Sequence, residues 1–253
     1  MSAPATSVSV PARFCGPDGS ANGGWMSGAV ARLLDCGPGD AAEVRLHLPP
    51  PLDTPMAVRR DADEVAVLTA DGARVATGRR ILGVQLTGDD EPDPPDPVDL
   101  ATADAAVVPW AAEDHPFPRC FVCGPSRPPG DGLRIFAGRV DGPADPPVFA
   151  APWTPDTGLA DPAGEIAAEI VWAALDCPGG QAVSVFGGDE GAVVLGTMQA
   201  SWDELPRAGA TYVVTSWPIA VDGRKHTSGA LLATGDGRVI GRSRSVWLTV
   251  PGP

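Results

Sequence analysis

The chain has 253 residues, 43% of them hydrophobic, which is enough to bury a core as one large domain or two smaller ones. Its net charge of −14 argues against a nucleic-acid or anionic-membrane surface, because such partners require clustered positive charge. The sequence lacks a run of about eighteen apolar residues and a signal-peptide pattern, and its five cysteines, an odd number, fit reduced thiols. We therefore expect a cytoplasmic protein.

Residues 1–86 are predicted to form a first unit in which a strand and a helix precede several further strands. Asn22 is a good N-cap for a helix from about Gly23 to Leu34, where apolar residues recur at helical spacing. In residues 42–86 the helical period is lost, and short Val- and Leu-rich segments alternate with turn signals. This pattern favours an antiparallel sheet.

Residues 87–118 change in character and are predicted to form a linker. The segment GDDEPDPPDPVD within them is acidic and rich in proline. Such a composition is too polar to pack and too stiff to collapse.

Residues 119–253 are predicted to form a second unit with the same order of strand, helix and sheet. The stretch 166–180, IAAEIVWAALDCPGG, starts with apolar residues on every face, which indicates a helix enclosed by other structure. Asp161 is a candidate N-cap for this helix, and Pro178 is expected to end it near Cys177. Four strand-like runs follow.

Two short sequence segments of the first unit recur in the second unit, in the same order. Leu34-Asp35-Cys36-Gly37 is similar to Leu175-Asp176-Cys177 with its following glycines, and the turn at Asp71-Gly72 is similar to that at Asp236-Gly237. The sequence therefore favours a duplicated unit. The carboxylate of Asp176 is expected near the negative end of a helix dipole, an unfavourable position that local hydrogen bonds or function must justify.

A long helix wrapped by an antiparallel sheet, duplicated in one chain, resembles the double hotdog architecture of acyl-CoA thioesterases of the PaaI-like and TesB-like kind. Asn22-Gly23-Gly24 resembles the loop that opens the hotdog helix. Cys120-Phe-Val-Cys-Gly with Gly132-Leu133 resembles the lead-in of PaaI-like thioesterases, and Leu175-Asp176 resembles the pair that carries their catalytic carboxylate. The resemblance implies an α+β tandem hotdog fold, each unit being an antiparallel sheet around a central helix.

The chain departs from this family in both units. The family commonly has His-Gly-Gly about nine residues before the Asp, where this chain has Ala167-Ala168-Glu169. The first unit keeps the glycines, but Asp35 lies twelve positions after Gly23 instead of about eight. Because hotdog sites are assembled between two units, the complete catalytic combination is Asn22, Gly23 and Gly24 of the first unit with Asp176 of the second.

The implied chemistry is hydrolysis of an acyl-CoA or acyl-carrier-protein thioester, without a cofactor. Backbone N–H groups at a helix N-terminus can stabilise the oxyanion, while a carboxylate acts as general base or nucleophile. Asp176 could instead only cap the turn after its helix, and Asn22 could be only an N-cap. A non-catalytic acyl-thioester binding protein and a hotdog dehydratase or hydratase remain as alternatives.

Arginines on two matching strands form a second candidate group. Arg79 and Arg80 in the first unit, with Arg242 and Arg244 in the second, could bind the phosphates of coenzyme A, since Arg matches phosphate geometry. The alternative is a solvated face of an acidic protein. The sequence leaves open whether two such chains form a homodimer.

Cys120 and Cys123 have the spacing of half a zinc site. A structural zinc site needs four ligands, and the nearby candidates in the sequence are His115 and Cys177. The alternative is that the two thiols are small buried groups beside the first strand of the second unit. Because no second CxxC motif and no close pair of histidines follows, the sequence predicts no metal site.

Overall fold

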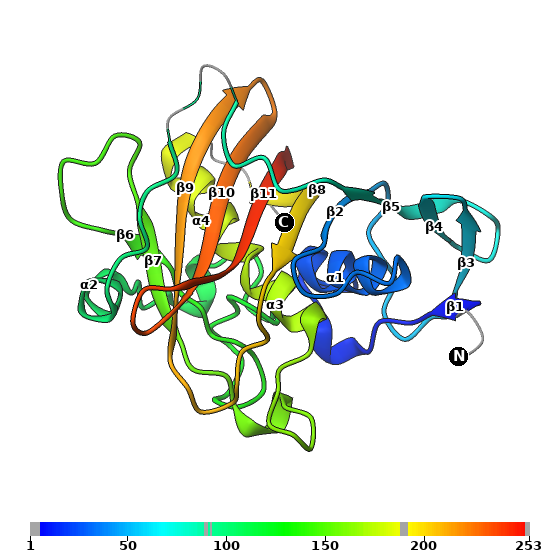
Figure 1. Cartoon of the computed structure of the whole chain (residues 1–253), viewed down its shortest axis with the longest axis horizontal. Helices are drawn as coiled ribbons and strands as arrows, with labels where there is room; N and C mark the ends of the chain where they lie inside the picture. The colour runs from blue at the N-terminus through cyan, green and yellow to red at the C-terminus, as the bar shows by residue number, and fades with distance from the viewer. Residues whose placement is uncertain (1–5, 89–90, 92, 188–191, 251–253) are drawn as a thin grey trace.

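The structure is a computed structural model that describes residues 6–88, 91, 93–187 and 192–250, without the side chains of residues 185–187. Within this part of the chain, eleven strands form one sheet in the order β1-β3-β4-β5-β2-β8-β11-β10-β9-β7-β6 (Figure 1). The elements of the first unit are β1 (Ser7–Val8), α1 (Gly23–Leu33), β2 (Ala41–Leu46), β3 (Met56–Asp61), β4 (Glu64–Leu68) and β5 (Arg74–Ile81).

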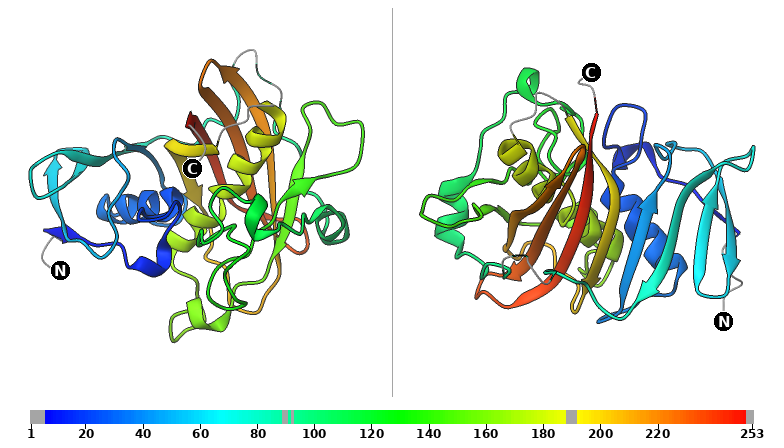
Figure 2. Two further views of the ribbon diagram at one scale, coloured as in Figure 1. Left: turned by 180° about the vertical axis from the view of Figure 1, so that it is seen from behind. Right: turned by 90° about the horizontal axis from the view of Figure 1, so that it is seen from above.

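The second unit supplies the other half of the sheet. Its elements are β6 (Gly138–Arg139), β7 (Phe149–Trp153), α3 (Ala168–Ala174), α4 (Cys177–Gly187), β8 (Ala192–Trp202), β9 (Tyr212–Asp222), β10 (Lys225–Thr234) and β11 (Val239–Val250). Helix α1 packs on β2 and β5, helix α4 packs on β9 and β10, and α3 contacts both helices (Figure 2). Each half of the sheet therefore curves around its own helical segment.

The two halves are joined where β2 pairs with β8 in antiparallel register. Glu43 lies opposite Gln199, and Gln199 Nε2 donates a 2.9 Å hydrogen bond to Glu43 Oε2. One hydrophobic core contains residues of both units, and its largest fully buried side chains include Trp153 and Trp172. The paired units consequently share their main hydrophobic core.

The two predicted Asp-Gly hairpins have the same local structure. In each, a threonine N–H donates to the carbonyl four residues later, and the glycine N–H donates back to that threonine carbonyl. These distances are 2.9 and 3.0 Å around Thr69, and 2.9 and 2.9 Å around Thr234. Gly72 and Gly237 both have a φ of 87°, a left-handed conformation that favours glycine. The recurrence seen in the sequence thus corresponds to a recurrence in structure.

The predicted single helix of the second unit is wrong in extent. The chain forms two helices in this region. Helix α3 has Ala167 as its N-cap, and helix α4 begins at Cys177, where the predicted helix was expected to end. Asp161 does not cap either helix, because its Oδ1 accepts hydrogen bonds from the N–H groups of Ala163 and Glu165 in a local turn. Pro178 sits in the first turn of α4, where the absence of an N–H is tolerated. Asp176 therefore lies in the short junction between two helices.

The acidic segment contains a helix of its own. Helix α2 (Leu100–Ala106) packs on β7 and β9, and its Ala103 is fully buried. Asp99 caps it by accepting a 2.8 Å hydrogen bond from the Thr102 N–H. This part of the segment packs on the second unit, contrary to the expectation from its polarity. The division into residues 1–86, 87–118 and 119–253 stays a prediction.

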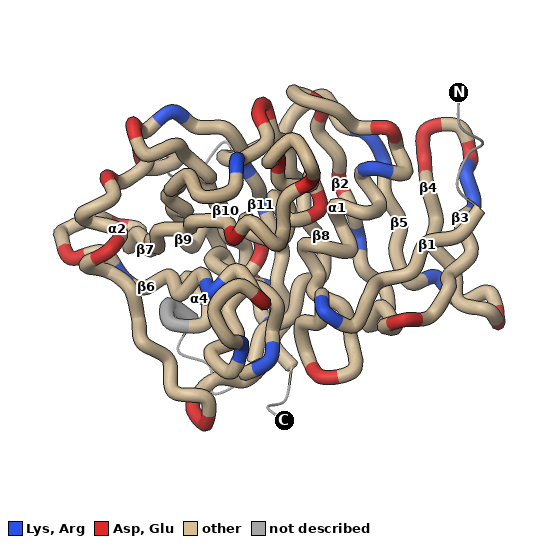
Figure 3. The backbone as a smooth tube through the Cα atoms, turned by 90° about the horizontal axis from the view of Figure 1, so that it is seen from below, with Lys and Arg blue, Asp and Glu red and all other residues tan. Residues whose placement is uncertain are grey.

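Charged residues are distributed over both units. Figure 3 shows Asp and Glu on loops across the whole molecule, with Lys and Arg interspersed among them. Among the described residues, no helix is long and apolar enough to cross a membrane.

Candidate active site

The site is built where the start of α1 meets the end of α3. The approach is close because α1 has glycine at two positions one turn apart, Gly24 and Gly28. A Cβ atom on Gly24 would lie 2.5 Å from Asp176 Cβ and 2.6 Å from the Trp172 carbonyl oxygen. A Cβ on Gly28 would lie 2.6 Å from Glu169 Cα. Glycine at these two positions is what lets the two backbones touch.

Asp176 is held against the first turn of α1. Its Oδ2 accepts a 2.9 Å hydrogen bond from the Gly24 N–H and a 2.8 Å hydrogen bond from Asn22 Nδ2. The Asn22 Oδ1 atom accepts from the Trp25 N–H at 2.9 Å, so this side chain caps α1 and orients the carboxylate together. Asp176 and Asn22 are each only 2% exposed. The predicted pairing of Asp176 with the Asn22 to Gly24 loop is thus present in the geometry.

The second carboxylate oxygen of Asp176 has a different environment. Asp176 Oδ1 is buried and has no hydrogen-bond partner among the described residues. Burial raises the pKa of Asp176 to about 7, although the hydrogen bond from the Gly24 N–H opposes this shift. A carboxyl group with a pKa near neutrality can act as an acid or as a base.

A cavity of about 470 Å³ adjoins Asp176 at the junction of the two units. Its polar wall includes Asn22, Gly23 and Asp176, and its apolar wall includes Leu46, Phe117, Val194, Leu195, Trp247 and Leu248. Gly23 is the first residue of α1, and its N–H has no hydrogen-bond partner in the described part of the chain. The cavity has the size and mainly apolar character of small-molecule sites.

The arginines predicted to bind substrate lie elsewhere. Arg242 Nη2 is 2.8 Å from Asp203 Oδ2, and Arg244 Nη1 is 2.6 Å from Glu91 Oε2. Neither arginine is among the described residues that line the cavity. Binding of coenzyme A phosphates by this pair stays a prediction, and it would require these ion pairs to open.

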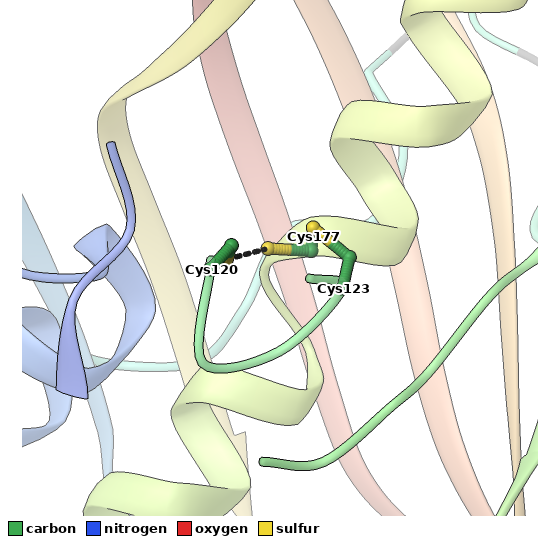
Figure 4. A group of neighbouring side chains, drawn as sticks. All are labelled: Cys120, Cys123 and Cys177. Carbon is green, nitrogen blue, oxygen red and sulfur yellow. Dashed lines mark hydrogen bonds between the residues drawn. The ribbon is translucent and has the colours of Figure 1, made fainter. Parts of the chain in front are cut away.

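Three cysteines lie beside the carboxylate, whereas the sequence offers Cys177 only as one of two nearby candidates and predicts no metal site. Cys120 and Cys123 come from one loop, and Cys177 follows Asp176 directly (Figure 4). Hydrogen bonds from the Cys123 and Cys177 thiols lower the pKa of the Cys120 thiol. The spacing of Cys120 and Cys123 was a visible signal, but only the fold reveals that Cys177 is their neighbour.

Solved structures resemble this chain over nearly its whole length. The TesB protein of Mycobacterium avium subsp. paratuberculosis is 12% identical, with a TM-score of 0.60 and coverage of 97% of this chain and 94% of that one. A protein of unknown function with a hot dog fold from Alicyclobacillus acidocaldarius is 11% identical, with a TM-score of 0.57 and coverage of 100% and 96%. The chain has a double hotdog fold.

A further structural match is the acyl-CoA thioesterase II TesB2 of Mycobacterium marinum. It is 12% identical, has a TM-score of 0.50 and covers 91% of this chain and 90% of its own. The sequence matches no family model and no curated protein. The comparisons confirm the α+β tandem architecture expected from the sequence, and at these identities the likeness concerns the fold alone.

Proposed function

We propose that this double hotdog protein hydrolyses acyl thioesters, with acyl-CoA or an acyl carrier protein as the carrier. The observation that carries the proposal is the buried Asp176, fixed by Asn22 and Gly24 at the wall of an apolar cavity. A carboxylate beside a helix N-terminus provides both the base and the oxyanion donor that hydrolysis needs.

In the proposed reaction, the thioester carbonyl oxygen binds at the Gly23 N–H. This donor is unpaired among the described residues and lies at the positive end of α1. As the tetrahedral intermediate forms, such a donor stabilises the oxyanion by about 3 kcal/mol. In this reaction Gly24 orients the carboxylate, because its N–H donates to Asp176 Oδ2.

Asp176 activates the attacking water. Its Oδ1, which has no partner among the described residues, accepts a proton as the water oxygen bonds to the carbonyl carbon. Collapse of the intermediate breaks the C–S bond, and the leaving thiolate takes up the proton. Direct attack by the carboxylate, followed by hydrolysis of the anhydride, is the other route open to this residue.

The apolar wall suits the acyl group of the substrate. Side chains from both units, including Leu46 and Trp247, enclose the space next to Asp176. Burial of an acyl chain against them contributes roughly 0.8 kcal/mol per methylene. Binding energy on the acyl side is therefore expected to depend on chain length.

The test is release of free thiol from short, medium, long and aromatic acyl-CoAs. We expect Asp176→Asn to lower kcat/KM about 10²- to 10⁴-fold. Asp35→Asn is the matched control, because Asp35 occupies the equivalent sequence position but its side chain is 85% exposed. Full activity in a folded Asp176→Asn variant would overturn the proposal.

One observation favours a second function, non-catalytic binding of acyl thioesters. The Gly24 N–H, which could stabilise an oxyanion, is engaged by Asp176. A binding protein would be stabilised thermally by acyl-CoA without turning it over, and the same panel separates this outcome from hydrolysis.

A further inference from the structure

The loop before β6 and the start of α4 bring three thiols together. The Sγ atoms of Cys120, Cys123 and Cys177 all lie within 4.8 Å of one another, and those of Cys120 and Cys177 are 3.6 Å apart. Figure 4 shows the three side chains converging from the loop and from the first turn of α4. Cys120 and Cys123 are 2% and 5% exposed. All three cysteines are free thiols in this structure.

The loop that carries two of these thiols is a tight turn suited to a thiolate. Hydrogen bonding with the backbone of Val122 and Cys123 lowers the pKa of the Cys120 thiol. The Gly124 N–H donates a 2.9 Å hydrogen bond back to the Cys120 carbonyl. A Cβ on Gly124 would lie 2.5 Å from Cys120 N and O, so the turn requires glycine. Backbone donors aimed at a sulfur stabilise its negative charge.

The sulfur separations match a tetrahedral metal ion. A zinc–sulfur bond of about 2.3 Å implies sulfur–sulfur separations of about 3.8 Å around the ion. The sulfur atoms of Cys120 and Cys177 are 3.6 Å apart, which is close to this value. Because all three sulfur atoms lie within 4.8 Å of one another, each pair would have to approach by at most about 1 Å to bind the ion. Thiolates select zinc over hard cations such as magnesium.

We propose that Cys120, Cys123 and Cys177 bind one zinc ion as thiolates. The fourth position is completed by Asp176, whose Oδ2 lies 4.0 Å from Cys177 Sγ, or by water from the cavity that Cys120 and Cys177 line. Binding releases the protons of those sulfurs that are still thiols. The site ties the 120–124 loop to the segment that carries Asp176.

A metal titration tests this proposal without relying on hydrolysis. Protein stripped of metal in the presence of a reductant is titrated with Co²⁺. We expect a thiolate-to-cobalt charge-transfer band and tetrahedral d–d bands that saturate at one equivalent. Protein grown with zinc should hold about one zinc per chain after dialysis, measured by elemental analysis.

Variants locate the ligands. Cys123→Ser is expected to lose zinc and the charge-transfer band, while the matched control Cys36→Ser retains both, because Cys36 lies outside the group. Asp176→Asn distinguishes the fourth ligand, since only direct ligation by the carboxylate predicts altered d–d bands.

Two outcomes would overturn the proposal, and both are read on the unmodified protein, so neither depends on a variant folding. Absence of metal and of the cobalt bands, with all five cysteines titrating as thiols in denaturant, would leave three small buried side chains. Titration of three thiols in protein isolated without reductant, with no metal, would indicate a disulfide within the group instead.

Discussion

The two helix starts of this double hotdog protein differ sharply. The start of α1 has a side-chain cap in Asn22 and a buried carboxylate partner in Asp176. The start of α3 has Ala167 at its cap position, with no side-chain hydrogen bond. Asp35, the sequence counterpart of Asp176, is exposed and has a φ of 56°. Both units keep the arrangement of a helix against a sheet. Of the two helix starts compared, only that of α1 has a side-chain N-cap that is hydrogen-bonded to a buried carboxylate.

Packing between the helices explains much of this asymmetry. Gly24 and Gly28 lie on α1, so the close approach brings the end of α3 onto the start of α1. At the opposite end of the contact, Glu169 in the first turn of α3 forms an ion pair with Arg32 of α1. A second site equivalent to that of Asp176 would require a free N–H at the start of α3 and a buried carboxylate from α1. The Arg32–Glu169 ion pair lies in this region instead.

The largest effect in this comparison is expected from Asn22→Asp. The new oxygen keeps the N-cap of α1, but it removes the donor to Asp176 and places a second carboxylate beside it. We expect a loss of about 3 kcal/mol in transition-state stabilisation, or roughly 100-fold in kcat, with little change in KM. Steady-state kinetics and thermal unfolding together measure it. Unchanged kcat would mean that Asn22 acts only as a cap.

A smaller effect is expected from Gly24→Ala, which adds a methyl group where the helices touch. The clash with Asp176 Cβ and the Trp172 carbonyl should cost about 2 kcal/mol of unfolding free energy. Denaturant unfolding measures this loss. Gly83→Ala is the matched control, because its Cβ would meet nothing within 4 Å. Equal stability of the two variants would contradict the close approach.

The smallest effect is expected from a change in stability at the start of α3. Ala167 is exposed and its backbone has the extended conformation of an N-cap residue. Ala167→Asn should raise the free energy of unfolding by about 1 kcal/mol through a new hydrogen bond to the first turn of α3. Thermal unfolding checks this, and thiol release should not change. A decrease in stability would show that the start of α3 cannot accept a cap.

Local signals in the sequence predicted local structure well. Asn22 before an apolar periodic segment gave the cap of α1, and the two Asp-Gly turns gave their hairpins. The N-cap of the helix in the second unit is Ala167 and not the predicted Asp161. Helix α4 is not predicted, because Pro178 is compatible both with ending one helix and with starting the next. Local pattern could not decide between these structures.

Contacts between the units were harder to predict. The resemblance to hotdog proteins predicts that Asp176 lies near the Asn22 loop. It does not predict the hydrogen bond from the Gly24 N–H to Asp176, which spans 152 positions and depends on how the helices pack. The neighbourhood of Cys177 and the two-cysteine loop likewise depends on the turn between α3 and α4. No periodicity in the sequence encodes such proximity.

The pairing of β2 with β8 has a consequence for the order of folding. Its side-chain hydrogen bond joins residues 156 positions apart, and such distant contacts form after the local hairpins because loop closure costs entropy. During synthesis, α1 and its sheet leave the ribosome long before Asp176 does. Until the second half of the chain has emerged, the edge of the first unit at β2 therefore lacks its partner strand, and the Asn22 Nδ2 and Gly24 N–H donors at the capped start of α1 lack Asp176.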